Sequence, residues 1–273
     1  MARLIKPLFI VSLIVILGAC SPYQKLLKST DYELKYNKAV EYYEAKSYAR
    51  TIQLLDELVP IFRGTPKSES VNYYYAMAHY QIGDYILASH YFKNFAIAFP
   101  LSEHVEEFIY LSAYCKYIES PRYNLDQTTT YEAIKELQGF INKYPKSARV
   151  EESNKLIDEL RGKLERKAYE NAYTYYQISD YHAALKGFEN LVKDFPDTRY
   201  KEDAYFYTFK SKYEYAFYSI DSKKLERYTE AKEAYQKFEN SFPESKKLKE
   251  ARMLNALIEK EIQRFTVQAN ENK

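Results

Sequence analysis

The side chains that could carry out covalent or acid–base chemistry are few, because the chain has two cysteines and four histidines in 273 residues. Metal sites and nucleophile–base pairs need such residues at close, regular spacing, as when two histidines four positions apart share a helix face. No histidine pair has this spacing, and the six glycines form no phosphate-binding loop. The acidic residues lie among lysines at helical spacing, which is typical of a solvated face. We therefore predict a protein that is not an enzyme and that holds no metal or other cofactor. The histidines are His79, His90, His104 and His182.

The first twenty residues indicate export. Two basic residues open the chain, an apolar run covers 8–17, and the small residues Gly18 and Ala19 precede Cys20. That order of charged, apolar and small residues is typical of a secretory signal. Ten apolar residues rise only ~15 Å as a helix, about half of the ~30 Å hydrocarbon core of a bilayer, so the run is too short to span it. We predict a signal peptide over 1–19.

Cys20 is the residue whose neighbours point to a covalent modification. Leu17-Gly18-Ala19-Cys20 resembles the bacterial lipobox, which implies that the sulfur of Cys20 receives a diacylglyceryl group and that Cys20 becomes the new N-terminus. Each buried methylene contributes ~0.8 kcal/mol, so several acyl chains anchor a protein stably. No acidic residue directly follows Cys20, and in lipoproteins of this kind that accompanies transport to the outer membrane. An acylated Cys20 also leaves Cys115 without a disulfide partner, and we expect Cys115 to be a buried, inert thiol.

The charge of the chain argues against a nucleic-acid partner. Lys plus Arg is 40 and Asp plus Glu is 38, for a formal net charge of +2. The signal segment contains two of the basic residues and no acid, so the remainder is balanced. A balanced chain lacks the summed positive field that draws proteins onto nucleic acid.

The body of the chain repeats itself. Residues 83–100 read GDYILASHYFKNFAIAFP and residues 179–196 read SDYHAALKGFENLVKDFP. Both contain Asp-Tyr, an alanine three residues after that tyrosine, a later aromatic residue and a final Phe-Pro. Proline ends a helix because it has no backbone N–H, and small residues at fixed positions let paired helices approach closely. The pattern resembles the tetratricopeptide repeat, a helix–turn–helix unit of about 34 residues.

Comparison of all such segments predicts the fold class. We predict an all-α protein, a tetratricopeptide-repeat superhelix of about five helix–turn–helix repeats plus a C-terminal capping helix, since an end repeat must hide its apolar face. Longer loops are expected at 119–130 and 219–227, and insertions in such arrays often mark a binding face. The repeats are placed near 34–62, 69–100, 103–145, 150–196 and 199–243. The predicted domains are the signal peptide 1–19, a lipid-anchored tether 20–33, repeats one to three over 34–145, repeats four and five with the capping helix over 146–265, and a frayed tail 266–273.

Tyrosine is strongly enriched, with 31 Tyr and no Trp. In successive first helices, a tyrosine lies three residues before and four after an equivalent alanine, and seven residues place both rings on one helix face. The first three repeats supply Tyr36, Tyr43, Tyr73, Tyr80, Tyr110 and Tyr117, and Tyr169 with Tyr176 continues the series. One interpretation is an aromatic groove for a peptide, because tyrosine combines apolar area with a hydroxyl. The other is that the rings pack between neighbouring repeats, and the pattern leaves both open.

The combination of a lipobox, five repeats and a terminal helix resembles the BamD family, the lipoprotein subunit of the outer-membrane β-barrel assembly machinery. The resemblance covers residues 20–265. It implies a non-catalytic scaffold on the periplasmic face of the outer membrane. Repeats one to three would receive unfolded outer-membrane proteins through the six tyrosines, and repeats four and five would dock on the central barrel subunit. It implies neither a small-molecule substrate nor a nucleic-acid partner.

Two alternatives share much of this pattern. Another tetratricopeptide-repeat periplasmic lipoprotein, coordinating cell-wall or envelope complexes, would have nearly every feature above, and only its binding partner would separate the two. A nutrient-capturing helical-repeat lipoprotein is disfavoured, because such proteins are typically longer and sugar platforms depend on tryptophan, which is absent here.

Overall fold

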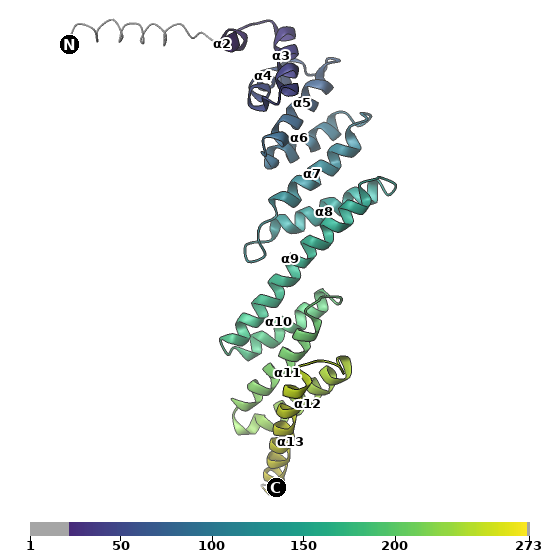
Figure 1. Ribbon diagram of the computed structural model, residues 1–273. Coiled ribbons are helices and arrows are strands. Elements are labelled where there is room, and N and C mark those ends of the chain that lie inside the picture. The colour runs from purple at the N-terminus through teal and green to yellow at the C-terminus, as the bar shows by residue number, and fades with distance from the viewer. Residues whose placement is uncertain (1–21, 272–273) are drawn as a thin grey trace, which may run out of the picture. The chain divides into compact units, whose positions relative to one another are not determined.

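The computed structural model describes residues 22–271, and every regular element in that part of the chain is a helix (Figure 1). This agrees with the predicted all-α class. Among these residues no helix combines the length and the apolarity needed to cross a bilayer. The helices are α2 (Pro22–Leu27), α3 (Tyr32–Glu44), α4 (Tyr48–Ile61), α5 (Ser68–Gln81), α6 (Tyr85–Ala98), α7 (Val105–Glu119), α8 (Thr128–Lys143), α9 (Val150–Gln177), α10 (Tyr181–Asp194), α11 (Lys201–Phe217), α12 (Asp221–Ser241) and α13 (Leu248–Glu271).

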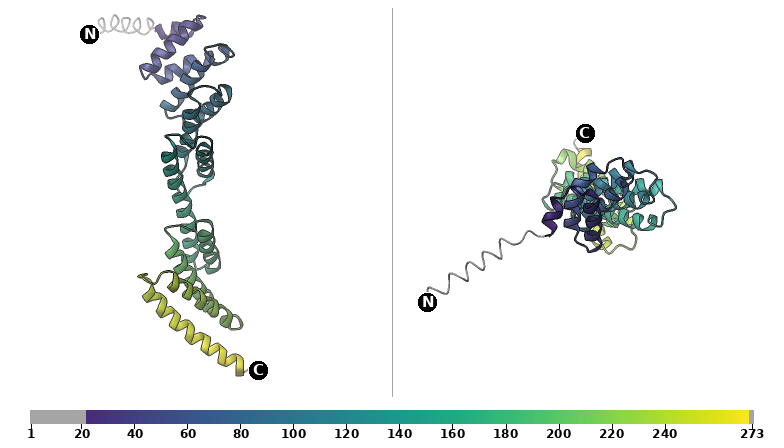
Figure 2. Two further views of the ribbon diagram at one scale, coloured as in Figure 1. Left: turned by 90° about the vertical axis from the view of Figure 1, so that its right-hand side faces the viewer. Right: turned by 90° about the horizontal axis from the view of Figure 1, so that it is seen from above.

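The helices form two compact units. The first contains the chain up to Ser120 together with Thr128–Asn154, and the second contains Pro121–Gln127 and the chain from Lys155 onward. The division falls within the long helix α9. Inside each unit, helices that follow one another in the chain lie against one another, as the two views of Figure 2 show.

The turn inside three of the helix pairs has a common construction. Asp84 caps α6 and Asp180 caps α10, each accepting a hydrogen bond from a backbone N–H in the first helical turn. The preceding residue has a positive φ, 81° at Gly83 and 64° at Ser179, and Lys46 repeats this at 57° before α4. Such a left-handed residue commonly follows a helix end, and a capping carboxylate satisfies an N–H that would otherwise lack a partner. The Asp-Tyr motif is therefore the junction between two paired helices.

The Phe-Pro motif ends the second helix of a pair. The N–H groups of Phe99, Phe195 and Phe242 make the last helical hydrogen bonds, and each of these residues then leaves the helical conformation with φ of −128°, −131° and −135°. The proline that follows each one cannot extend the ladder. The phenylalanine rings pack against the cores beside them.

Small residues bring the paired helices together. Ala39, Ala76, Ala172 and their counterparts in the second helices are buried. A close approach is at Gly187 in α10, where a Cβ would lie 2.7 Å from the Cβ of Ala172 in α9. Only glycine fits there without displacing a neighbouring helix.

Three regions differ in detail from the expectation. The predicted loop 219–227 is wrong, because α12 begins at Asp221; its first residues, DSKKLER, lack Gly and Pro and favour a helix. The helix α2 lies within the segment predicted as a tether. Finally, α13 continues to Glu271, beyond the predicted end of the capping helix. The loop predicted at 119–130 is present between α7 and α8.

Candidate protein-binding site

The six tyrosines predicted to line a groove lie on α3, α5 and α7, the first helices of three successive pairs. Five are half-buried, and Tyr110 is buried with 2% exposure. Each has at least one aromatic ring partner at a centroid distance of 6.2 Å or less. In each case this ring partner is a residue outside the six, and the partners fall into two recurring arrangements.

The first tyrosine of a pair lies under a basic side chain from the start of the following pair. The guanidinium of Arg149 lies 4.6 Å from the ring centroid of Tyr110 and donates to both carboxylate oxygens of Glu107, at 2.6 and 3.2 Å. The ion pair raises the pKa of Arg149 above its ordinary value, although burial partly opposes this. We call this ring, cation and acid a cation clamp. The same clamp recurs at Tyr36 with Lys67 and Glu33, and at Phe206 with Lys247 and Asp203.

In two other pairs, an aromatic ring replaces the cation. Tyr73 stacks on Phe108 with a centroid distance of 5.4 Å and an interplanar angle of 12°, and His104 lies 4.5 Å away. Tyr169 stacks on Tyr200 at 4.5 Å and 10°. Clamps and stacks both cover the first ring with residues that follow its own helix pair in the chain.

The second tyrosine of a pair closes its own turn. Tyr43 meets Tyr48, Tyr80 meets Tyr85 and Tyr176 meets Tyr181, at centroid distances of 5.4, 5.7 and 5.8 Å and interplanar angles of 66°, 68° and 61°. Edge-to-face contact is a favoured geometry for aromatic pairs. These contacts hold the end of a first helix against the start of its partner helix.

On α7 and on α9, a third tyrosine that the sequence analysis did not identify lies between the first and the second tyrosine of the same helix. Tyr114 stacks between Tyr110 and Tyr117 at 5.9 and 5.8 Å, and the corresponding contacts on α9 pass through Tyr173 at 6.0 and 6.2 Å. Their spacing of four residues from the first ring was the available signal. The result is a continuous ladder of three phenol rings on α7 and another on α9.

Burial raises the pKa of three of the six phenols. It raises the pKa of Tyr43 and of Tyr80 to about 12, and it raises the pKa of Tyr110 further. A tyrosine side chain combines a hydroxyl with apolar ring edges, a surface suited to contact with polypeptide. Packing between helices is the role that the contacts show for all six candidates, and the groove role of their exposed edges stays a prediction.

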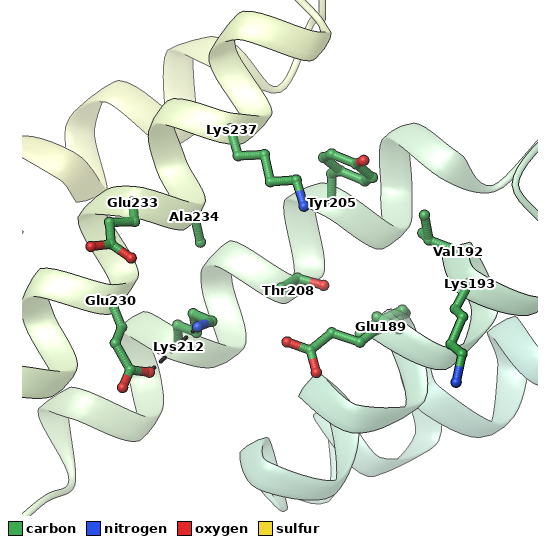
Figure 3. Close-up of a pocket in the computed structure, with 11 residues that line it drawn as sticks. Glu189, Val192, Lys193, Tyr205, Thr208, Lys212, Glu230, Glu233, Ala234 and Lys237 are labelled. Carbon is green, nitrogen blue, oxygen red and sulfur yellow. Dashed lines mark hydrogen bonds and ion pairs between the residues drawn. The ribbon is translucent and has the colours of Figure 1, made fainter.

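The second unit contains a groove of different chemistry between α10, α11 and α12, with a cavity volume of about 470 Å³ (Figure 3). Lys212 pairs with Glu230 at 3.4 Å across it, and Lys237 lies 5.3 Å from the ring centroid of Tyr205. The apolar lining is Phe188, Val192, Tyr205 and Ala234, and the charged lining is Glu189, Lys193, Lys212, Glu230, Glu233 and Lys237. Three acids and three lysines leave the groove without net charge. Sequence reasoning missed it because its residues come from three helices.

The loop between α7 and α8 folds back on α9. Arg166 lies 4.1 Å from the ring centroid of Tyr123, and the amine of Lys167 donates to the carbonyl of Leu125 at 2.6 Å. The buried Gln127 side chain donates to the carbonyl of Arg122 at 2.9 Å. This predicted insertion is thus an ordered part of the second unit.

The cysteine and histidines in the described part of the chain take part in no metal-binding cluster. Cys115 is a free, buried thiol, as predicted, and burial raises its pKa to about 12. Among residues 22–271, no three His, Cys, Asp or Glu side chains lie close enough together to hold a metal ion. Cys20 lies outside the described residues, so its lipidation stays a prediction.

Paired helices with capped turns, Phe-Pro ends and small residues at the crossings define a helical-repeat protein. A tetratricopeptide-repeat model matches residues 220–245, which confirms the predicted fold class. A family model described as outer membrane lipoprotein (YfiO, the BamD family) matches residues 29–216. The chain belongs to this family of outer membrane lipoproteins. No curated protein was found to match the chain. Family and fold together associate the chain with the outer membrane and with protein–protein interaction in outer-membrane assembly.

Proposed function

We propose that the protein is a non-catalytic scaffold of the outer-membrane β-barrel assembly complex, held by lipid on Cys20 at the periplasmic face. In this proposal repeats one to three bind unfolded outer-membrane proteins, repeats four and five bind the central barrel subunit, and no cofactor takes part. The family match over residues 29–216 is the observation that carries the proposal.

The tyrosine-rich first helices support the substrate role. The half-buried rings of Tyr43, Tyr80 and Tyr117 are fixed by their neighbours and still expose an edge. A pre-packed ring loses little entropy when a ligand covers it, and its hydroxyl can pair with a peptide backbone. Such a surface accepts many apolar sequences without reading charge.

An exposed apolar patch in the second unit supports the docking role. Tyr218 is 70% and Ile220 72% exposed at the turn between α11 and α12, with Phe217 beside them. Tyr181, from the preceding turn, stacks on Tyr218 with a centroid distance of 6.0 Å and an interplanar angle of 5°. We call these four residues the turn-tip patch. Rigid exposed aromatic residues next to aliphatic ones are typical anchors of protein interfaces.

Affinity purification of the lipidated protein from membranes tests the proposal, with partners identified by mass spectrometry. We expect an outer-membrane barrel protein with periplasmic domains. Tyr218→Asp with Ile220→Asp should reduce its recovery at least about tenfold, the usual effect of losing an interface anchor. The matched control is Ile97→Asp with Leu101→Asp, which changes two apolar residues of the first unit that are more exposed still, at 79% and 99%.

The substrate role is tested separately with a peptide from an unfolded outer-membrane protein. Tyr117→Ala should weaken its binding, whereas Tyr131→Ala, at an exposed position on α8, should not. Recovery of only cell-wall or division proteins in the purification, with no barrel subunit, would overturn the proposed complex.

A further inference from the structure

The short helix α2 is fastened to the first helix pair rather than hanging free. The hydroxyl of Tyr23 donates to the side-chain oxygen of Gln53 at 2.8 Å. Its ring meets the edge of Tyr42 at 5.5 Å, and the guanidinium of Arg50 lies over both rings, at 5.2 and 5.4 Å. Leu26 and Leu27 pack on the core of the same pair.

A buried lysine reinforces this attachment. The Lys35 side chain is 1% exposed, and its amine donates to the carbonyl of Leu27, the last residue of α2, at 2.9 Å. The same amine pairs with Glu57 of α4 at 2.6 Å. A buried ammonium is costly unless it is paired and hydrogen-bonded, so displacing α2 would leave Lys35 without one of its two acceptors.

The short stretch of chain between Cys20 and α2 places α2 at the membrane if Cys20 carries lipid. Cys20 is two residues before Pro22, and two residues span at most about 7 Å. An acyl chain on Cys20 enters the hydrocarbon core, so α2 must lie within about a nanometre of the headgroups. Because α2 is fixed to α3 and α4, its contact with the bilayer also orients the first helix pair.

The segment formed by α2 and the residue after it has the charge that such a contact needs. Lys25 and Lys28 are exposed, and within residues 22–271 neither has an ion-pair partner. The segment 22–30 contains no acidic residue, and the first acid, Asp31, is used to cap α3. Lysines this close to an anionic leaflet are attracted to its phosphates within a Debye length.

We propose that α2 is a membrane-surface element that lies on anionic phospholipid headgroups through Lys25 and Lys28 and fixes the orientation of the first repeat. This rests on the acylation of Cys20 in the proposed function. The ligand is the phosphate headgroup of the leaflet that holds the acyl chains.

The test uses the acylated protein in vesicles of phosphatidylethanolamine and phosphatidylglycerol that contain a headgroup-nitroxide lipid. A fluorophore on Gln24→Cys reports on α2, and one on Lys146→Cys, at an exposed turn after α8, is the reference; the native Cys115 is buried. We expect strong quenching at position 24 and weak quenching at 146. Lys25→Glu with Lys28→Glu should shift α2 about 30-fold or more from the headgroup-bound state to one lifted off the surface as far as its tether to Cys20 allows, from the usual contribution of a lysine at an anionic surface. The quenching at position 24 should fall accordingly.

Two controls separate the possible causes. Lys246→Glu with Lys249→Glu makes the same charge change on exposed lysines of the second unit and should leave the quenching at 24 unchanged. Tyr23→Ala, which releases α2 without removing its charges, should increase the mobility of the label. Weak quenching at 24 with lipid still present on Cys20 by mass spectrometry would overturn this inference alone. A spectrum without lipid would overturn the anchor of the proposed function, and this inference with it.

Discussion

The helix pairs α5–α6 and α9–α10 share a turn and a second-helix pattern, yet they pack differently at one position. Seven residues after the capping aspartate, α6 has Tyr91 and α10 has Gly187. The Tyr91 ring fills its site against Tyr75 and His79, at 4.7 and 5.0 Å. At Gly187 the neighbouring helix occupies that space instead, because Ala172 approaches to within contact of the backbone. One local pattern therefore accommodates either a large ring or the neighbouring helix at the same position, and the choice depends on a residue outside the recurring motif.

The largest expected effect tests what the two pairs have in common. Phe92 and Phe188 occupy equivalent positions and both have 0% exposure. Phe92→Ala and Phe188→Ala should each cost about 3–5 kcal/mol of local stability, the usual range for a buried phenylalanine. Native-state hydrogen exchange should show the loss within the unit that carries the change, since repeats couple mainly to their neighbours. An equal loss of protection in both units would contradict this separation.

The second prediction tests the difference at position 187. Gly187→Ala should destabilise the second unit by about 1–2 kcal/mol, because the new Cβ would lie 2.7 Å from that of Ala172, and overpacking outweighs the gain in helix propensity. Gly139→Ala is the matched control: it lies in α8 with nothing within 4 Å of the new Cβ, and it should gain up to about 1 kcal/mol. Urea unfolding measures both, and a stabilised Gly187→Ala variant would show that α9 and α10 can separate freely.

A third, smaller difference is the left-handed residue of the turn. Gly83 adopts φ of 81° without steric penalty, whereas Ser179 holds 64° against the cost of its Cβ. Ser179→Gly should stabilise the α9–α10 pair by about 1 kcal/mol, and Gly83→Ser should destabilise the α5–α6 pair by a similar amount. Thermal unfolding of the two variants checks the opposite signs, and changes of equal sign would mean that the turns are not equivalent.

The smallest effect concerns the equivalent phenols Tyr80 and Tyr176. Burial raises the pKa of Tyr80 to about 12; it also raises the pKa of Tyr176, but the nearby Lys210 amine opposes this rise. We expect Tyr176 to ionise at a lower pH than Tyr80 in an alkaline titration. Ultraviolet difference spectra of the Tyr80→Phe and Tyr176→Phe variants assign each ionisation to its residue. Because each folded pKa lies above the unfolded value of 10.0, the associated stability is present below pH 10 and is lost as the pH rises toward 12. Simultaneous ionisation would show that Lys210 has no influence.

Local motifs were predictable because they act over a few residues. The Asp-Tyr and Phe-Pro motifs set the capped starts and the ends of α6 and α10, and the alanine spacing identified the helix crossings. The family resemblance drawn from the lipobox and repeats is confirmed by the match over 29–216. The loop predicted at 219–227 was wrong because residues 221–227 contain no Gly or Pro and form the first turns of α12.

The sequence by itself determined the helical class, the helix ends at the Phe-Pro motifs and the positions of the tyrosines on one helix face, since helix period and proline are properties of neighbouring residues. Only the tertiary structure decided how deeply each ring is buried, that Arg149 covers Tyr110, and that α2 is fixed by Lys35. These contacts join residues that are distant in the chain: Lys35 and Leu27 are 8 positions apart, and Arg149 and Tyr110 are 39 positions apart. No local sequence pattern indicates which helix supplies the partner.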